Sequence, residues 1–399
     1  RIAPTRDARS WRDVSRLDRD LKLLAAGNLV FGLSVGMYLQ LLFVHAMDLG
    51  ASRFTIGVLN AIMLTCIAAG NLPGAWASHR FPLKTVIVAI WWLTVPTAVC
   101  FALAPSCPWL IPGMVLTGLY MANNPAFKTY IALKSDRERM ARNLTLIFGT
   151  YPAGLVVAPL LGGALADAYG MRTVFWVSAA LFAVSSLTVT LIRDVPYRSE
   201  QAPLKPAAVS RNRAFRRYVA FFLVGYLAVY VGQSFLTPYL SVVHEQGYLA
   251  LGVFAALAAL GAALLTPLSG RVADLRGPRA GAALVLVIVG AGTVLLLTGP
   301  SSMFWGIAMF LCGGYETFRF LATGIVGRSF GEIPLAWGYA IFDTTMGLPM
   351  AGGSLLGGLL FGIGASLPFV FVVTVAAVLL VTLGALRPRN VQARHDVGT

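Results

Sequence analysis

The chain has 399 residues, of which 57% are hydrophobic and 12% carry a charge. Its mean hydropathy of +0.75 lies outside the usual range of soluble globular proteins. The apolar residues form uninterrupted runs of about 20, which excludes one large soluble core and predicts helices that cross a bilayer. The net charge is +15, but Lys and Arg lie almost entirely between the apolar runs, so no nucleic-acid partner is expected.

The first 22 residues are basic, and the apolar run after them is too long for the core of a cleavable signal peptide. Four scattered cysteines have neither metal-ligand spacing nor the pattern of a disulfide framework. We therefore expect neither a metal nor a cofactor.

The apolar runs predict twelve crossings, which we take in chain order. A polar linker rich in proline and charge, 194–217, divides them into two sets of six. The first set is predicted at 23–46, 54–77, two spans within 85–127, 144–166 and 173–192. The second is predicted at 218–243, 248–268, two spans within 280–327 and two within 335–386. The expected fold is thus an all-α membrane protein with a basic segment at 1–22, six-helix bundles at 23–193 and 218–386, and a tail at 387–399.

The placement of positive charge predicts the orientation. Arg53 and Arg172 lie on one side of the spans and Arg319 lies within one, while every other Lys and Arg lies on the opposite side. Positive loops stay cytoplasmic. The sequence therefore predicts that both termini and the linker are cytoplasmic, in a cell membrane and most simply a bacterial inner membrane.

The two halves resemble each other at an offset of about 195 residues, as expected of parallel repeats related by an axis along the membrane normal. Gly57-Val-Leu59 corresponds to Gly252-Val-Phe254, and Gly162-Gly163 corresponds to Gly357-Gly358. This repeat predicts two pseudo-symmetric bundles that rock against each other.

A loop motif then indicates a family. Gly270-Arg-Val-Ala-Asp274-Leu-Arg-Gly277-Pro-Arg279 is similar to the signature G-x-x-x-D-x-x-G-x-R/K of the major facilitator superfamily, and the resemblance extends over all twelve spans. In the first half the equivalent loop has Ser78 in place of the acidic residue. The resemblance implies gating roles for Asp274, Gly277 and Arg279, with the Asp274 carboxylate facing the N-terminus of the fifth span.

The fifth span resembles the motif G-x-x-x-G-P-x-x-G-G that is associated with antiporters of this family. It reads Gly154-Leu-Val-Val-Ala158-Pro159-Leu-Leu-Gly162-Gly163, with one glycine replaced by alanine. The resemblance implies a gating role for Gly154, Pro159 and Gly162 and favours efflux; close helix packing alone explains the same residues. Against a typical drug and proton antiporter, Met114 replaces the expected arginine of the fourth span, and the first span has no carboxylate.

Ionisable residues inside the spans are the first functional candidates, because a charge in the membrane needs a partner or a polar cavity. Glu316 and Arg319 lie three residues apart on one helical face and near mid-membrane, so they form either a structural pair or a proton and substrate site. Asp343 and His45 are further proton candidates, with helix packing and an interfacial position as the respective alternatives. Lys128 either snorkels or points inward as a second cation opposite Arg319.

The family resemblance implies that the first, fourth, seventh and tenth spans line a central cavity. Polar and aromatic residues on these spans then become candidates for substrate contact, because such walls suit amphipathic small molecules. Besides Lys128 and Arg319, they are Asn28, Tyr38, Gln40, Tyr120, Asn123, Asn124, Tyr226, Tyr230, Gln233 and Tyr315.

These observations predict a monomeric secondary transporter that works by alternating access and exports amphipathic small molecules in exchange for protons. The alternative within transport is uptake of an organic anion or a sugar-like solute, which inward-facing Lys128 and Arg319 would favour. A non-transporting receptor is the alternative of another class. An enzyme is not expected, because the sequence has neither metal-spaced histidines nor a nucleophile elbow.

Overall fold

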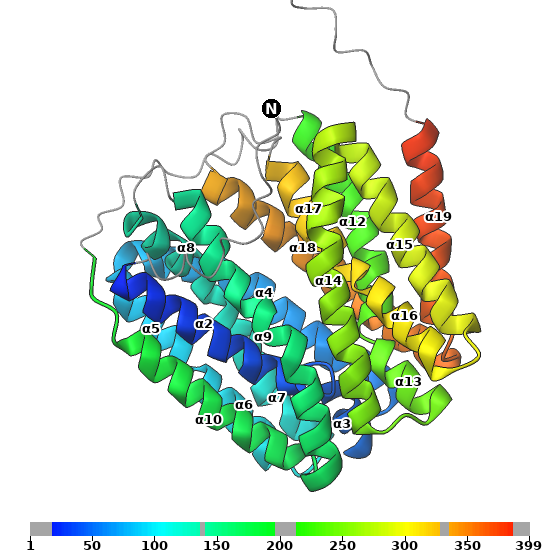
Figure 1. Cartoon of the computed structure of the whole chain (residues 1–399), viewed down its shortest axis with the longest axis horizontal. Coiled ribbons are helices and arrows are strands. Elements are labelled where there is room, and N and C mark those ends of the chain that lie inside the picture. Colours follow the sequence, from blue (N-terminus) through cyan, green and yellow to red (C-terminus); the bar gives the residue numbers. More distant parts are fainter. Residues whose placement is uncertain (1–17, 136–139, 196–212, 328–334, 386–399) are drawn as a thin grey trace, which may run out of the picture.

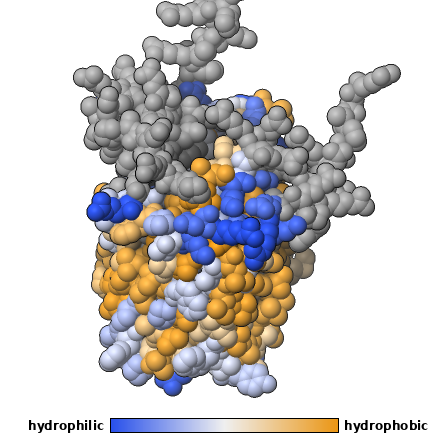
Figure 2. All heavy atoms as spheres, turned by 90° about the vertical axis from the view of Figure 1, so that its left-hand side faces the viewer, coloured by the Kyte–Doolittle hydropathy of each residue, from blue (hydrophilic) through white to orange (hydrophobic). Residues whose placement is uncertain are grey.

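The structure is a computed structural model that describes residues 18–135, 140–195, 213–327 and 335–385. These residues are almost entirely helical (Figure 1). Ten stretches are long and apolar enough to cross a membrane. The stretches 107–133 and 302–327, where the sequence predicts the fourth and tenth spans, consist of shorter helices in series. The side of the molecule shown in Figure 2 carries a broad hydrophobic belt below a band of hydrophilic residues.

The helices before residue 195 pack with one another, and we call them the N-group. α2 packs against α9 and α10, α4 packs against α7, and α6 packs against α10. The N-group consists of α2 (Arg19–Tyr38), α3 (Leu42–Asp48), α4 (Arg53–Arg80), α5 (Leu83–Trp92), α6 (Thr94–Leu103), η2 (Cys107–Leu110), α7 (Ile111–Tyr120), η3 (Met121–Asn123), α8 (Asn124–Leu133), α9 (Met140–Tyr169) and α10 (Met171–Thr190).

The helices after residue 212 form a second set, the C-group, on the right of Figure 1. α12 packs against α18 and α19, α14 packs against α15 and α16, and α15 packs against α19. The C-group consists of α12 (Arg213–Gln233), α13 (Leu236–His244), α14 (Tyr248–Arg276), α15 (Pro278–Thr298), α16 (Ser302–Cys312), α17 (Gly314–Gly327), α18 (Leu335–Ile363) and α19 (Leu367–Ala385).

Each of the four spans expected to line a cavity is interrupted within the described residues. The breaks separate α2 from α3, α7 from α8, α12 from α13 and α16 from α17. The four helices of the contact between the groups, α4, α9, α14 and α18, are instead continuous over 28 to 30 residues and keep prolines inside them. Proline is tolerated in such helices where neighbouring groups satisfy the freed carbonyl.

The two groups meet through two glycine contacts that lie at equivalent positions of the internal repeat. A Cβ added to Gly57 of α4 would lie 2.9 Å from the Cα of Gly358 on α18, and one added to Gly252 of α14 would lie 3.0 Å from the Cα of Gly163 on α9. Only residues without a side chain allow backbones to approach this closely. These are the glycines that the repeat pairs at equivalent positions, so the contact between the groups is itself pseudo-symmetric.

Polar contacts between the groups lie at the end of the molecule remote from the start of α2 and the end of α19, where Figure 1 shows α3 beside α13. The Asn60 amide donates to the Ser234 hydroxyl at 2.6 Å and to the Ser354 hydroxyl at 2.9 Å, and all three side chains are buried. We call this end of the molecule the outer end, and Asn60, Ser234 and Ser354 the outer latch, after the orientation that the positive loops predict. In addition, the Thr237 hydroxyl donates to the Gln40 carbonyl at 2.6 Å, and the Tyr248 hydroxyl donates to Asp48.

At the opposite end a charged cluster holds the N-group together. Lys134 of α8 pairs with the buried Asp20 of α2 at 2.8 Å. The Tyr130 hydroxyl donates to the carbonyl of Arg193, just past α10, at 2.6 Å. These contacts join three helix ends of one group, so they can persist while the two groups move against each other.

Two matched glycine substitutions are expected to separate movement between the groups from packing within one. Gly252→Val places a branched side chain between α14 and α9 and is expected to disfavour contact at the outer end by about 1–3 kcal/mol, with little loss of fold. Gly162→Val instead pushes against the Met37 backbone within the N-group and is expected to lower thermal stability. Thermal unfolding in detergent, together with spin-label distances between the groups, distinguishes the two effects. A loss of stability in both variants without any change in distance would contradict this assignment.

Candidate functional site

The candidate site is built around one ion pair on α17. Arg319 Nη2 lies 2.9 Å from Glu316 Oε2, and the two side chains are 39% and 33% exposed, so both remain accessible. The spacing of three residues places them on one face of the helix. α17 starts at the break after Gly313, and Glu316 therefore lies in its first turn.

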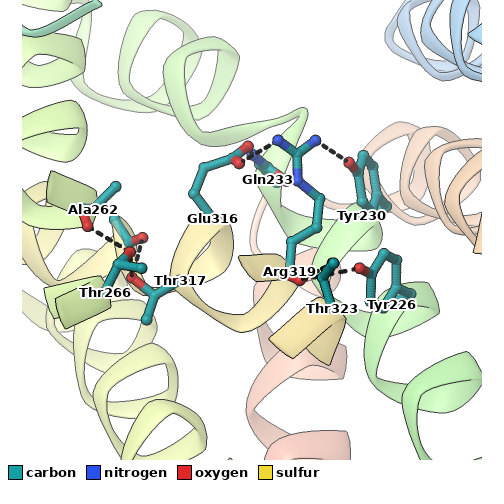
Figure 3. Close-up of polar contacts among 10 residues, drawn as sticks. Tyr226, Tyr230, Gln233, Ala262, Thr266, Glu316, Thr317, Arg319 and Thr323 are labelled. Carbon is teal, nitrogen blue, oxygen red and sulfur yellow. Dashed lines mark hydrogen bonds and ion pairs between the residues drawn. The ribbon is translucent and has the colours of Figure 1, made fainter. Parts of the chain in front are cut away.

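α12 supplies the polar groups that orient this pair. Gln233, the last residue of α12, donates from its amide to Glu316 Oε1 at 2.6 Å. Arg319 Nη1 donates to the Tyr230 hydroxyl at 3.3 Å, and the Tyr226 hydroxyl donates to the Arg319 carbonyl at 3.3 Å. Figure 3 shows the guanidinium held between Glu316 and Tyr230. The predicted residues Tyr226, Tyr230, Gln233, Glu316 and Arg319 thus lie together in one network.

One aromatic residue of the N-group, Tyr151, lies near this pair. Tyr151 of α9 lies within electrostatic range of both Glu316 and Arg319. Its ring packs against Phe31 with centroids 5.6 Å apart, and Phe31 packs edge-on against Tyr120 at 5.4 Å. We call Phe31, Tyr120 and Tyr151 the aromatic wall. The site therefore combines Tyr151 of one group, backed by the buried Phe31 and Tyr120, with paired charges from the other.

Two further charges lie close to this network. Asp343 of α18 is accessible and lies within electrostatic range of Arg319 and of Lys128, which belongs to the other group. Lys128 Nζ lies 6.0 Å from the ring centroid of Phe148. Asp343 and Lys128 therefore link the charges of the C-group to those of the N-group, and the four ionised side chains would sum to zero.

Several other predicted residues lie in helix packing. The Asn28 amide donates to the Ile147 carbonyl at 2.9 Å and to the Thr150 hydroxyl at 3.2 Å, which joins α2 to α9. Tyr38 is fully buried, with its ring against Phe101 and Phe175 inside the N-group. These placements match helix packing better than substrate contact.

His45 and Tyr315 are also buried away from the ion pair. The His45 ring packs against Phe175, with centroids 5.5 Å apart, and the Tyr315 hydroxyl lies 2.9 Å from Thr293 of α15. Gln40 is half-buried at the break after α2, and Asn123 is buried in η3. The side chain of Asn124 lies outside the described part of the structure.

The motif of the fifth span lies on two contacts of α9. Gly154 packs against the α2 backbone near Leu33, and Gly162 packs against α2 at Met37. The Pro159 carbonyl instead faces Gly252 of the C-group. The motif thus serves packing within one group and the contact between the groups at the same time.

Asp274 and Arg279 lie on either side of Gly277, at the turn between α14 and α15, and both are exposed. Gly277 has a φ of 92°, a left-handed conformation that glycine adopts without strain. Residues 136–139, which precede α9, lie outside the described part. The predicted contact of Asp274 with the start of that helix therefore stays a prediction.

Sequence reasoning missed Tyr151, Phe31 and the outer latch. It took substrate contacts only from polar, charged and tyrosine side chains of the first, fourth, seventh and tenth spans, whereas Tyr151 lies on the fifth span and Phe31 is apolar. Asn60 carried a usable signal, because an amide inside an apolar span needs a hydrogen-bond partner. Within the described residues, no three His, Cys, Asp or Glu side chains are grouped so that they could hold a metal ion.

Two groups of membrane-spanning helices related by an internal repeat are typical of secondary transporters. The chain belongs to the major facilitator superfamily, because the family model described as Major Facilitator Superfamily matches residues 24–336. Members of this family are transporters and not enzymes.

Among known proteins, the chain is 24% identical over 190 residues to the multi-drug resistance efflux pump PmrA of Streptococcus pneumoniae. That match covers 46% of each protein, so the chain spans less than half of this relative. It is 26% identical over 340 residues to the multidrug resistance protein MdtL of Escherichia coli O139:H28, covering 82% of the chain and 84% of the relative. The crystal structure of the nucleoside transporter NupG has the same fold, with a TM-score of 0.76 at 13% identity over 92% of this chain and 99% of NupG.

Proposed function

We propose that this protein is a proton-coupled exporter of amphipathic small molecules that works by alternating access. The observation that carries the proposal is the accessible Glu316–Arg319 pair near Tyr151 of the aromatic wall. A carboxylate that can accept a proton beside an aromatic surface provides both a coupling group and a binding surface. Relatives that bear the names of multidrug resistance proteins support export of such molecules.

We further propose twelve crossings in two bundles, with the interrupted stretches 107–133 and 302–327 as the remaining two spans. The charge asymmetry of the loops supports cytoplasmic termini. In that orientation the outer latch closes the external end, and the structure corresponds to a state that faces the cytoplasm. Transport then requires the outer latch to open while the opposite ends of the groups approach each other.

The ion pair suggests how a proton and a substrate exchange. Glu316 pairs with Arg319 only while its carboxylate is ionised, and a proton added at Oε2 removes that attraction. A cationic or dipolar substrate on the aromatic wall also interacts with the ionised carboxylate. Proton and substrate therefore compete for Glu316, which is the coupling that an antiporter requires. When the proton leaves to the cytoplasm, the pair with Arg319 re-forms.

Transport into proteoliposomes with an imposed pH gradient tests this function. Lipophilic aromatic cations are expected to accumulate inside vesicles that are acidic within, because internal protons exchange for external substrate. Organic anions of similar size serve as the comparison. No gradient-dependent flux of any amphipathic compound would contradict the proposal.

A second candidate is uptake of an organic anion, and it is favoured by one observation. Asp343 lies within electrostatic range of two cations, Lys128 and Arg319, which belong to opposite groups. A proton on Asp343 would give the four side chains one net positive charge, which attracts a carboxylate or phosphate, and Lys or Arg binds such groups by charge-assisted hydrogen bonds.

Lys128→Gln distinguishes these two functions. If the substrate is an anion, losing one charged contact of about 1.5–3 kcal/mol is expected to raise KM about tenfold to one-hundredfold. If the substrate is a lipophilic cation, KM is expected to stay within about threefold. Initial rates of uptake measured at several salt concentrations check the result, because screening weakens only the charged contact.

A further inference from the structure

The side of the C-group carries an apolar groove at its outer end, away from the ion pair. It has a volume of about 960 Å³ and runs between α14 and α16, which lie side by side in Figure 1. Its walls are apolar, and large side chains beside it face outward, with Val253 39% and Met303 72% exposed. The lining residues include Leu249, Val253, Leu257, Met303, Ile307 and Phe310.

Polar groups are confined to the outer rim of the groove. Asp167 at the end of α9, Gln246 before α14 and Ser302 at the start of α16 form this rim. The Asp167 carboxylate is exposed and has neither a hydrogen-bond nor an ion-pair partner among the described residues. An unpaired carboxylate thus lies at the mouth of an apolar groove that opens sideways.

The groove has the depth of one lipid leaflet. From Gly247 to Leu257, at 1.5 Å per residue, α14 advances about 15 Å, which is half of the ~30 Å hydrocarbon thickness. A bilayer lipid can therefore place an acyl chain against α14 and α16 while its head group stays beside Asp167. Gly306 of α16 keeps the groove open, because a Cβ at this position would narrow it to 3.3 Å from Leu257 Cδ1 on the α14 wall.

The head group rather than the chain must give selectivity. Lipid tails are as apolar as the groove, so an acyl chain gains little free energy by entering it. A primary ammonium forms charge-assisted hydrogen bonds with a carboxylate, whereas a quaternary ammonium has no N–H to donate. A glycerol head group brings no positive charge.

We propose that this groove is a binding site for a phospholipid with a primary ammonium head group, of the phosphatidylethanolamine type. The site spans the boundary between the groups, because Asp167 belongs to the N-group and the walls belong to the C-group. The lipid therefore stabilises the state in which α9 and α14 touch at their outer ends. This inference rests on the fold and not on the proposed substrate.

Photolabelling tests the site in proteoliposomes. A phosphatidylethanolamine with a photoreactive acyl chain is expected to label peptides from 248–257 and 302–310, and unlabelled phosphatidylethanolamine is expected to compete better than phosphatidylglycerol or phosphatidylcholine. Asp167→Asn is expected to reduce labelling about twofold to fivefold, the effect of one exposed ion pair. Glu245→Gln, which changes a nearby carboxylate outside the lining, is expected to have no effect.

A second variant tests the groove itself. Gly306→Phe fills it and is expected to reduce labelling of both peptides to background, whereas Gly290→Phe, which adds the same side chain at an open position of α15, is expected to leave labelling unchanged. Equal competition by all head groups together with full labelling of Asp167→Asn would overturn the proposal. Displacement of the label by a lipophilic cation but not by phosphatidylethanolamine would assign the groove to transported molecules and would also overturn it. If Gly306→Phe fails to fold, the Asp167 result decides.

Discussion

Glu316→Gln is expected to abolish transport driven by a pH gradient while leaving substrate exchange measurable. The glutamine keeps the shape and the hydrogen-bonding capacity toward Gln233 but cannot take up or release a proton near neutral pH. Without proton exchange, the gradient supplies no driving force. We expect concentrative uptake into acidic vesicles to fall to the passive level, about one-hundredfold for a gradient of two pH units.

Counterflow experiments supply the control for this prediction. Exchange of labelled for unlabelled substrate needs alternating access but no net proton movement, so it should survive in Glu316→Gln. Glu245→Gln, at an exposed position outside the site, should behave like the unmodified protein. Full gradient-driven accumulation by Glu316→Gln would show that another group carries the proton, and Asp343→Asn would then be the next variant to measure.

Asn60→Ala is expected to produce the second large effect, a shift of the conformational equilibrium toward an open outer end. The alanine removes two hydrogen bonds that cross between the groups, to Ser234 and to Ser354. At about 0.5–1.5 kcal/mol each, this destabilises the closed outer end by about 1–3 kcal/mol. The ratio of open to closed forms should therefore rise about fivefold to one-hundredfold.

Spin labels at the outer ends measure this shift. Tyr169 of α9 and Val243 of α13 are 73% and 43% exposed and belong to different groups, so the distance between labels placed there reports opening. Asn28→Ala is the matched control, because its amide also makes two hydrogen bonds, both within the N-group. It should lower thermal stability without changing the distance distribution. Identical distributions for Asn60→Ala and the unmodified protein would show that the outer latch does not hold the closed state.

The apolar runs, the loop motif and the internal repeat of the sequence predicted much of the architecture. The transmembrane character and the family follow from apolar runs and from the loop motif at Gly270, and both are confirmed. The repeat paired Gly57 with Gly252, and these two glycines make equivalent contacts between the groups. These features were predictable because each depends on composition or spacing along a single helix.

Features that depend on neighbouring helices were not predictable. The predicted span 23–46 contains a break, since α2 ends at Tyr38 and α3 begins at Leu42, and hydropathy does not register such a break. Tyr38 and Tyr230 look alike in sequence, but one packs against phenylalanines and the other binds Arg319. The direction in which each side chain points is decided by helix rotation, which a single sequence does not specify.

The Glu316–Arg319 pair was predicted from sequence, and its surroundings were predicted in part. Two ionisable residues at a spacing of three in an apolar span pointed to a pair, which the structure contains at 2.9 Å. The position of Tyr151 near this pair was not predicted, because α9 has no charged residue at that depth that would indicate a site. Its assignment to the site follows only from the packing of the two groups.

Proton release on substrate binding tests the central claim, competition between proton and substrate at Glu316, most directly. In weakly buffered detergent solution, addition of a transported amphipathic cation should release protons from the unmodified protein, up to about one per molecule bound. Glu316→Gln should bind the same compound and release none. Saturating binding to the unmodified protein with no proton release at any pH at which the protein stays folded would contradict the account.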